Sequence, residues 1–156
     1  MAPREPFMGA RASPIFRLPF VASADDVDAL GHISNIAYVR WVQNVAGTHS
    51  EAVGYDLAAY RQVGSVFVVR RHEITYLQPA LAGDAIELVT WIESWRGASS
   101  PRKTQIIRQR DGAELARCVT LWALVNEQTG RPTRTPAAMR EAFAKEPRAL
   151  DPLPIP

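Results

Sequence analysis

Residues 26–35, with the sequence DVDALGHISN, bring two carboxylates, a histidine and an asparagine close together. Asp28 has the chemistry of a nucleophile or a general base, and His32 could orient water, a substrate or the carboxylate. Apolar residues at helical spacing follow this segment, so it precedes a helix. The first turn of a helix carries unpaired backbone N–H groups and the positive end of the helix dipole. Such a segment could attack a carbonyl carbon and stabilise the oxyanion that forms.

The same residues also have a structural interpretation. Asp25, Asp26 and Asp28 could do no more than form the turn that precedes a helix. We interpret Asp26 as structural or solvated, and Asn35 as a helix cap rather than a reactive group. His32 taken alone would fit a hydrogen-bonded loop histidine equally well. The residue types therefore allow catalysis but do not decide between the two interpretations.

Two helices are predicted after this loop. Apolar residues recur at helical spacing from Asn35 to Val53, and Gly54 is a typical stop signal. Gly47 is unfavourable inside a helix, so we expect it to mark a close approach to a flat surface, namely a sheet. A short second helix is predicted at 56–64, because an aspartate begins this segment and a glycine ends it.

Segments rich in β-branched and aromatic residues predict strands at 15–22, 65–77, 85–95, 103–110 and 114–126. Pro19 restricts the first strand to an edge or a bulge. Short turns between the last four strands predict a four-strand antiparallel meander. A terminal helix is predicted at 136–145. This order predicts a two-layer α+β domain in which the long helix lies against the sheet.

Length and composition narrow the class of protein. A chain of 156 residues can bury one core, so we expect one domain at 14–146, between a flexible tail at 1–13 and a proline-rich tail at 147–156. The 18 basic and 16 acidic residues are scattered, which argues against nucleic-acid binding. A single Cys118 and the lack of an apolar run of ~20 residues predict a cytoplasmic protein without a membrane span. The histidines lack metal-ligand spacing, so we expect no metal and no cofactor.

The pattern D-x-D-A-x-G-H-x-S-N-x-x-Y-x-x-W, followed later by TYLQPALAGD, resembles the hotdog-fold acyl-CoA thioesterases. The similarity is greatest to the 4-hydroxybenzoyl-CoA thioesterase-like branch and covers residues 15–145. It implies a long central helix wrapped by a curved antiparallel β-sheet, and dimers or tetramers with active sites between subunits. The strand at 85–95 has apolar residues on both faces, which also favours a homodimer or tetramer.

The resemblance assigns roles to the residues of the loop. It implies that Asp28 is the catalytic carboxylate, which attacks the thioester directly or activates water. The backbone N–H groups from His32 to Ser34, those of Ile33 and Ser34 above all, are then the expected oxyanion donors, and the side chain of His32 orients the reacting groups. The dimer interface would complete this site.

The expected substrate is an acyl-CoA or acyl-carrier-protein thioester. Because basic side chains bind phosphates well, four surface residues are candidates for contacts with coenzyme A: Arg70, Arg71, Arg102 and Lys103. Tyr38, Trp41 and Tyr60 could line a pocket for the acyl group, although aromatic residues at helical spacing belong more often to a core.

Some features depart from the family pattern, and two alternatives stay open. Leu30 stands where a polar residue is common, and QPAL at 78–81 has no acid, which argues against a second carboxylate. A branch that uses a helix glutamate would need Glu51, far along the helix. The alternatives are a hotdog dehydratase or hydratase and a non-catalytic acyl-binding protein. The sequence ISN after His32, in place of proline and glycine, favours hydrolysis over hydration.

Overall fold

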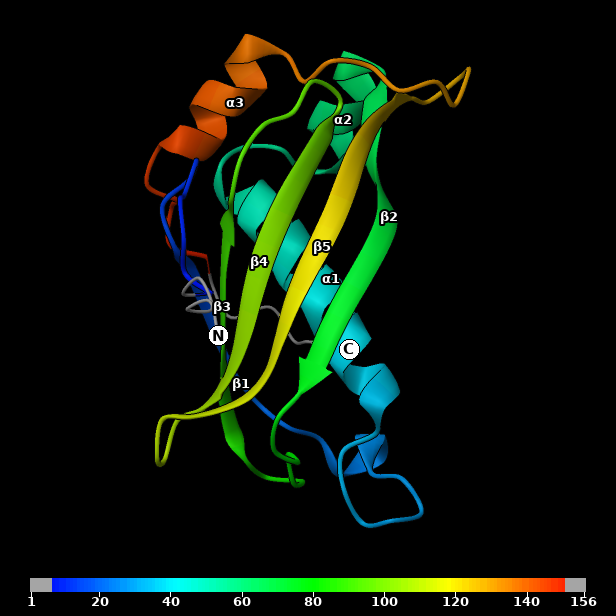
Figure 1. Cartoon of the computed structure of the whole chain (residues 1–156). Coiled ribbons are helices and arrows are strands. Elements are labelled where there is room, and N and C mark those ends of the chain that lie inside the picture. The colour runs from blue at the N-terminus through cyan, green and yellow to red at the C-terminus, as the bar shows by residue number, and fades with distance from the viewer. Residues whose placement is uncertain (1–6, 151–156) are drawn as a thin grey trace, which may run out of the picture.

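The computed structural model describes residues 7–150, and Figure 1 shows a long helix lying across one face of a curved sheet. The strands are β1 (Phe16–Val21), β2 (Ser65–Tyr76), β3 (Ala85–Ile92), β4 (Ser99–Arg108) and β5 (Ala113–Asn126). The helices are α1 (Asn35–Ala52), α2 (Leu57–Val63) and α3 (Ala137–Ala144), with a short 3-10 helix, η1 (Ala24–Asp26), before α1. The predicted α+β class is confirmed. The outer parts of the two predicted tails, 1–6 and 151–156, lie outside the described residues.

The sheet has the order β1-β3-β4-β5-β2 with antiparallel neighbours throughout. The predicted four-strand meander is wrong, because β2 pairs with β5 and not with β3. The 12-residue β2 matches the 14-residue β5 better than the 8-residue β3, so this pairing satisfies more backbone groups. β1 forms the opposite edge, where Pro19 is tolerated as predicted.

The strand β4 begins earlier than the predicted 103–110. Backbone hydrogen bonds in both directions between Arg96 and Ser99 close the preceding turn, at 2.8 and 3.0 Å. The chain therefore enters the ladder at Ser99, and Pro101 lies inside the strand opposite Leu121. The predicted start of this strand is too late because the prediction assigned Pro101 to the turn.

The helix α1 begins and ends as the sequence indicates. The Ser34 hydroxyl accepts the Ile36 N–H at 3.3 Å and caps the helix, and Gly54 with φ +97° follows its end. One face of α1 packs on the sheet to form the core. Buried members of this core come from both layers: Tyr38, Trp41, Val42, Val45, Leu18, Ile86, Leu88 and Ile106.

The strand β3 is buried on both faces within the single chain, so the expected exposed apolar face at 85–95 is wrong. Val89 and Trp91 are 4% and 0% exposed, and the Trp91 ring meets Phe7 edge-on at 6.0 Å. Ser13 Oγ accepts the Ile92 N–H at 2.8 Å. Residues 7–13 thus contact the strand that was expected to need a second subunit.

Gly47 does not mark a close approach between α1 and the sheet. It is exposed, and a Cβ at this position would meet no atom within 4 Å. The predicted contact is wrong because this turn of the helix borders an open cavity.

Replacing Gly47 with alanine is expected to raise the free energy of unfolding by about 0.5–1 kcal/mol. Alanine loses less backbone entropy than glycine in a helix, and space for its methyl group is available. Urea denaturation would measure this gain in the free energy of unfolding. The slope of that free energy against urea concentration should not change. A loss of stability would show that the added methyl group does meet an obstacle.

None of the helices within residues 7–150 is both long and apolar enough to cross a membrane.

Candidate functional site

The loop between η1 and α1 is tied to the start of the helix. Ser34 donates its N–H to the Asp26 carbonyl at 2.7 Å, and Asp28 donates its N–H to the His32 carbonyl at 2.8 Å. The Asp26 carboxylate forms an ion pair with Arg40 of α1 at 2.5 Å. Asp26 therefore fastens the loop to the helix, in agreement with its structural interpretation.

Asp28 lies exposed in this loop. Its Oδ1 accepts the Leu30 N–H at 2.9 Å, and its carbonyl accepts the Gly31 N–H at 3.1 Å. Gly31 has φ +80°, a conformation that favours glycine and closes the turn. Oδ2 of Asp28 accepts no hydrogen bond from residues 7–150, so one carboxylate oxygen is available for a substrate or a water molecule.

A pocket of 280 Å³ joins this loop to the end of β2. Figure 1 shows the two segments at the same end of the molecule, where α1 begins and β2 ends. The lining residues combine polar and apolar side chains: Asp28, Leu30, His32, Ile33, Asn35, Tyr38, Tyr76, Leu77, Gln78 and Pro79. The structure therefore brings the predicted Asp28, His32 and Asn35 to one site.

Two of the predicted oxyanion donors already have partners. Ile33 donates its N–H to the Ala80 carbonyl at 2.9 Å, and the Ser34 N–H is bonded to Asp26. The prediction that these two groups are free is wrong, because the loop uses them to anchor itself. Within the part of the chain that the structure describes, the backbone N–H groups of His32 and Asn35 have no hydrogen-bond partner.

Asn35 is the first residue of α1 and not its cap, which is Ser34. The Asn35 carbonyl accepts a hydrogen bond from the Tyr76 hydroxyl at 3.2 Å. The prediction of a capping role is therefore wrong by one position. Asn35 instead lines the pocket, and its carbonyl is bonded to another lining residue, Tyr76.

Sequence reasoning missed the contribution of the β2 end. Tyr76, Leu77, Gln78 and Pro79 line the pocket although they are far from the loop in sequence. The Tyr38 hydroxyl accepts the Ala80 N–H at 2.9 Å, and burial raises the pKa of Tyr38. The segment QPAL at 78–81 carries no acid, and no local pattern in it indicates that it meets the loop before α1.

The four basic candidates separate into two groups. Arg70 and Arg71 are exposed on the edge strand β2. Arg102 is 4% exposed and bonds to His49, so its expected position on the surface is wrong. Lys103 is half-buried and donates from Nζ to the Phe7 carbonyl at 2.7 Å. Arg102 therefore cannot meet the phosphates of coenzyme A from the outer surface.

Residues 22–143 match a family model described as the thioesterase-like superfamily. Comparison with curated proteins finds no match.

Solved structures with a similar fold include a DHNA-CoA thioesterase from Staphylococcus aureus, at 19% identity and TM-score 0.75 over 83% of this chain and 88% of that one. An acyl-ACP thioesterase from Bacteroides thetaiotaomicron is 22% identical, with TM-score 0.75 over 88% of this chain and 56% of that one. A hypothetical protein from Staphylococcus aureus, solved in complex with CoA, is 14% identical, with TM-score 0.78 over 91% and 93% of the two chains. These similarities show the hotdog fold.

Proposed function

Because the chain belongs to the thioesterase-like superfamily, we propose that it hydrolyses an acyl-CoA or acyl-carrier-protein thioester, with Asp28 as the catalytic carboxylate. The observation that carries this proposal is the unbonded Oδ2 of Asp28, in one pocket with His32 and Asn35. A carboxylate beside backbone N–H groups without partners suits attack on a carbonyl carbon.

In the proposed reaction, Asp28 attacks the thioester carbonyl directly or takes a proton from the water that attacks. The carbonyl oxygen becomes negative, and the N–H groups of His32 and Asn35, which have no partner within residues 7–150, stabilise it. The carbon–sulfur bond then breaks. In the direct route this leaves an anhydride between the acyl group and Asp28, which a water molecule then hydrolyses to regenerate the carboxylate. In both routes the thiolate takes up a proton, one water molecule is consumed, and the products are the free acid and the thiol. The His32 side chain orients the substrate or the water.

A panel of acyl-CoA and acyl-carrier-protein thioesters, with release of the thiol as the signal, tests this function. Hydrolysis of at least one member well above the background rate is expected. Hydration of an enoyl-CoA without release of the thiol would favour the dehydratase or hydratase alternative. Binding of thioesters without turnover of any member would favour the non-catalytic alternative.

We predict that replacing both Arg70 and Arg71 with alanine raises KM for an acyl-CoA at nearly constant kcat. Contacts with the distant phosphates are equal in the ground and transition states, so their loss weakens binding only. Steady-state kinetics at low salt measures the effect, which should shrink as salt screens it. Arg61→Ala, at an exposed position on α2, is the matched control. An unchanged KM in the double variant would remove these two residues from the site.

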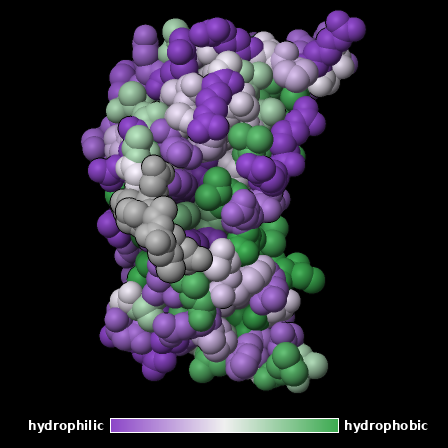
Figure 2. Space-filling view, viewed as in Figure 1, coloured by the Kyte–Doolittle hydropathy of each residue, from purple (hydrophilic) through white to green (hydrophobic). Residues whose placement is uncertain are grey.

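We predict a homodimer or a tetramer that forms through β2. Within residues 7–150 this strand pairs with β5 alone, and its other edge is open. Tyr76 and Leu77 at its end are 42% and 46% exposed, and Figure 2 shows hydrophobic residues reaching the surface toward the lower and right parts of the view. Open edges and apolar surface favour pairing with a second copy. Sedimentation of a monomer at micromolar concentration would contradict this prediction.

A further inference from the structure

A second cavity lies at the opposite end of α1 from Asp28. It has a volume of 220 Å³ and is bounded by all three helices and by four of the strands. Gly47 of α1 borders it, roughly 18 Å along the helix from Asn35 at 1.5 Å per residue. This cavity is therefore separate from the pocket that holds Asp28.

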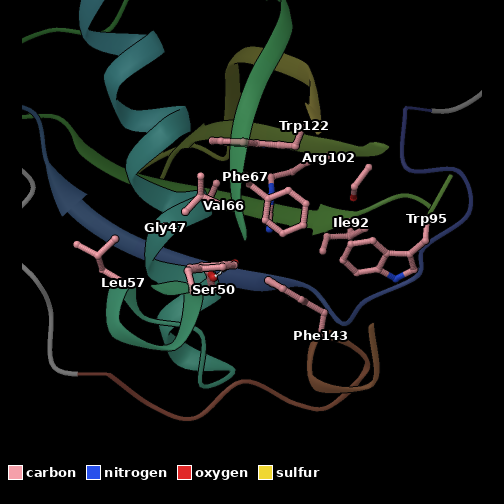
Figure 3. Close-up of a pocket in the computed structure, with 13 residues that line it drawn as sticks. Gly47, Ser50, Leu57, Val66, Phe67, Ile92, Trp95, Arg102, Trp122 and Phe143 are labelled. Atoms are coloured by element: carbon pink, nitrogen blue, oxygen red, sulfur yellow. Dashed lines mark hydrogen bonds between the residues drawn. The ribbon is translucent and has the colours of Figure 1, made fainter. Parts of the chain in front are cut away.

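The cavity contains a buried positive charge. Figure 3 shows Arg102 among the aromatic side chains that line the cavity. Arg102 is 4% exposed, and its Nη1 donates to His49 Nδ1 at 2.9 Å and to Thr90 Oγ1 at 3.1 Å. Burial lowers the pKa of Arg102 to about 10, so the guanidinium group stays charged at neutral pH.

This charge has no negative partner among the described residues. Arg102 forms no ion pair within residues 7–150. Burial, and then the charge of Arg102, lower the pKa of His49 to about 2, so this partner is neutral. Burial raises the pKa of Tyr60, which lines the cavity, to about 12, so its hydroxyl is neutral as well. A buried charge without an opposite charge is costly, and an anion from solution would remove that cost.

The rest of the lining defines the body of such an anion. Phe67, Ile92, Trp95, Trp122 and Phe143 make most of the wall apolar. The volume of 220 Å³ is below the roughly 300–1,000 Å³ of most pockets for drug-sized ligands, so the body must be small. A carboxylate matches the planar fork of an arginine, whereas a fully hydrated phosphate does not match apolar walls.

We propose that this cavity is a binding site for a small apolar carboxylic acid, whose carboxylate pairs with Arg102 and whose hydrocarbon body fills the aromatic chamber. The site does not require the proposed hydrolysis. A ligand enters beside Gly47, where the missing side chain leaves the helix surface open.

Binding of octanoate tests this site, with 1-octanol as the neutral ligand of the same length. Titration calorimetry gives the affinity, and the fluorescence of Trp95 and Trp122 reports on occupation of the cavity. Octanoate is expected to bind at least tenfold more tightly than 1-octanol. Equal affinities would overturn the proposal, because they would show that Arg102 does not select an anion.

Three variants locate the site. Arg102→Met should lower the affinity for octanoate by about 10- to 100-fold, as expected for loss of a charge-assisted hydrogen bond. Its affinity for 1-octanol should stay nearly unchanged. Arg110→Met, at an exposed position in the turn between β4 and β5, should bind both ligands as the wild type does. Gly47→Phe keeps Arg102 but narrows the entrance to the cavity, so it should lower the affinity for both ligands.

Unchanged octanoate binding in Gly47→Phe would overturn the assigned cavity, even if Arg102→Met fails to fold. Unchanged octanoate binding in folded Arg102→Met would overturn the role of the arginine. Asp28→Asn should bind octanoate with wild-type affinity, which separates this site from the proposed site of hydrolysis. Loss of octanoate binding in Asp28→Asn would place the ligand in the other pocket and overturn the proposal.

Discussion

Asp28→Asn is expected to lower kcat for thioester hydrolysis by roughly 10²- to 10⁴-fold, the range for loss of a positioned acid-base group. Asparagine keeps the size of the side chain, and its amide oxygen can still accept the hydrogen bond from the Leu30 N–H. It removes the negative charge and the basicity that either form of the reaction needs. Thiol release in the steady state measures the effect, and circular dichroism checks the fold.

Asp26→Asn is the matched control, since it makes the same chemical change two residues away. It removes the ion pair with Arg40, leaving a hydrogen bond to a neutral amide oxygen, and should cost about 1 kcal/mol of stability or less, with a much smaller loss of kcat. His32→Ala should fall between the two if the imidazole only orients groups. Near-wild-type kcat in Asp28→Asn, with activity lost in Asp26→Asn or His32→Ala, would show that the wrong carboxylate has been chosen and would strengthen the hydratase alternative.

Trp41→Ala is expected to lower the free energy of unfolding by about 3–5 kcal/mol, the usual cost of truncating a buried tryptophan. Trp41 is 1% exposed, and its ring packs against Phe20 at 4.8 Å and Tyr38 at 5.0 Å between centroids. Its removal would leave a void between α1 and the sheet that rigid neighbours cannot fill. Denaturant titration followed by circular dichroism measures the loss.

Ile36→Ala is the control on the same helix, because Ile36 is 76% exposed and its truncation creates no cavity. Its effect should stay within about 0.5 kcal/mol. A small effect of Trp41→Ala, comparable with that of Ile36→Ala, would contradict the assignment of Trp41 to the core. It would also reopen the possibility that Trp41 lines an acyl pocket.

Much of the fold could be predicted because its signals are local. Helical spacing and Gly54 located α1 to within a residue, and Asp56 and Gly64 did the same for α2, where the Asp56 carboxylate accepts the Ala59 N–H at 2.8 Å. The pairing of β2 was missed. Strand pairing depends on which partner satisfies most backbone groups, and that partner, β5, lies far along the chain.

The position of the candidate site could be predicted from the sequence, because the polar loop and the helix that follows it are neighbours along the chain. Which groups of the loop are available depends on contacts made in the folded chain. The N–H groups of Ile33 and Ser34 donate to the carbonyls of Ala80 and Asp26 and are therefore not available. The contact between Ile33 and Ala80 joins distant segments, and no local pattern predicts it.

The same distinction explains Arg102. Its residue type favours the surface, where most arginines lie, and its neighbours in sequence do not contradict this. In the folded chain, residues from α1, α2, α3 and four strands line the cavity around it, so that a charge expected in water lies among mostly apolar walls. Burial depends on contacts between segments that are distant in sequence, and for this reason the cavity and its arginine could be found only in the structure.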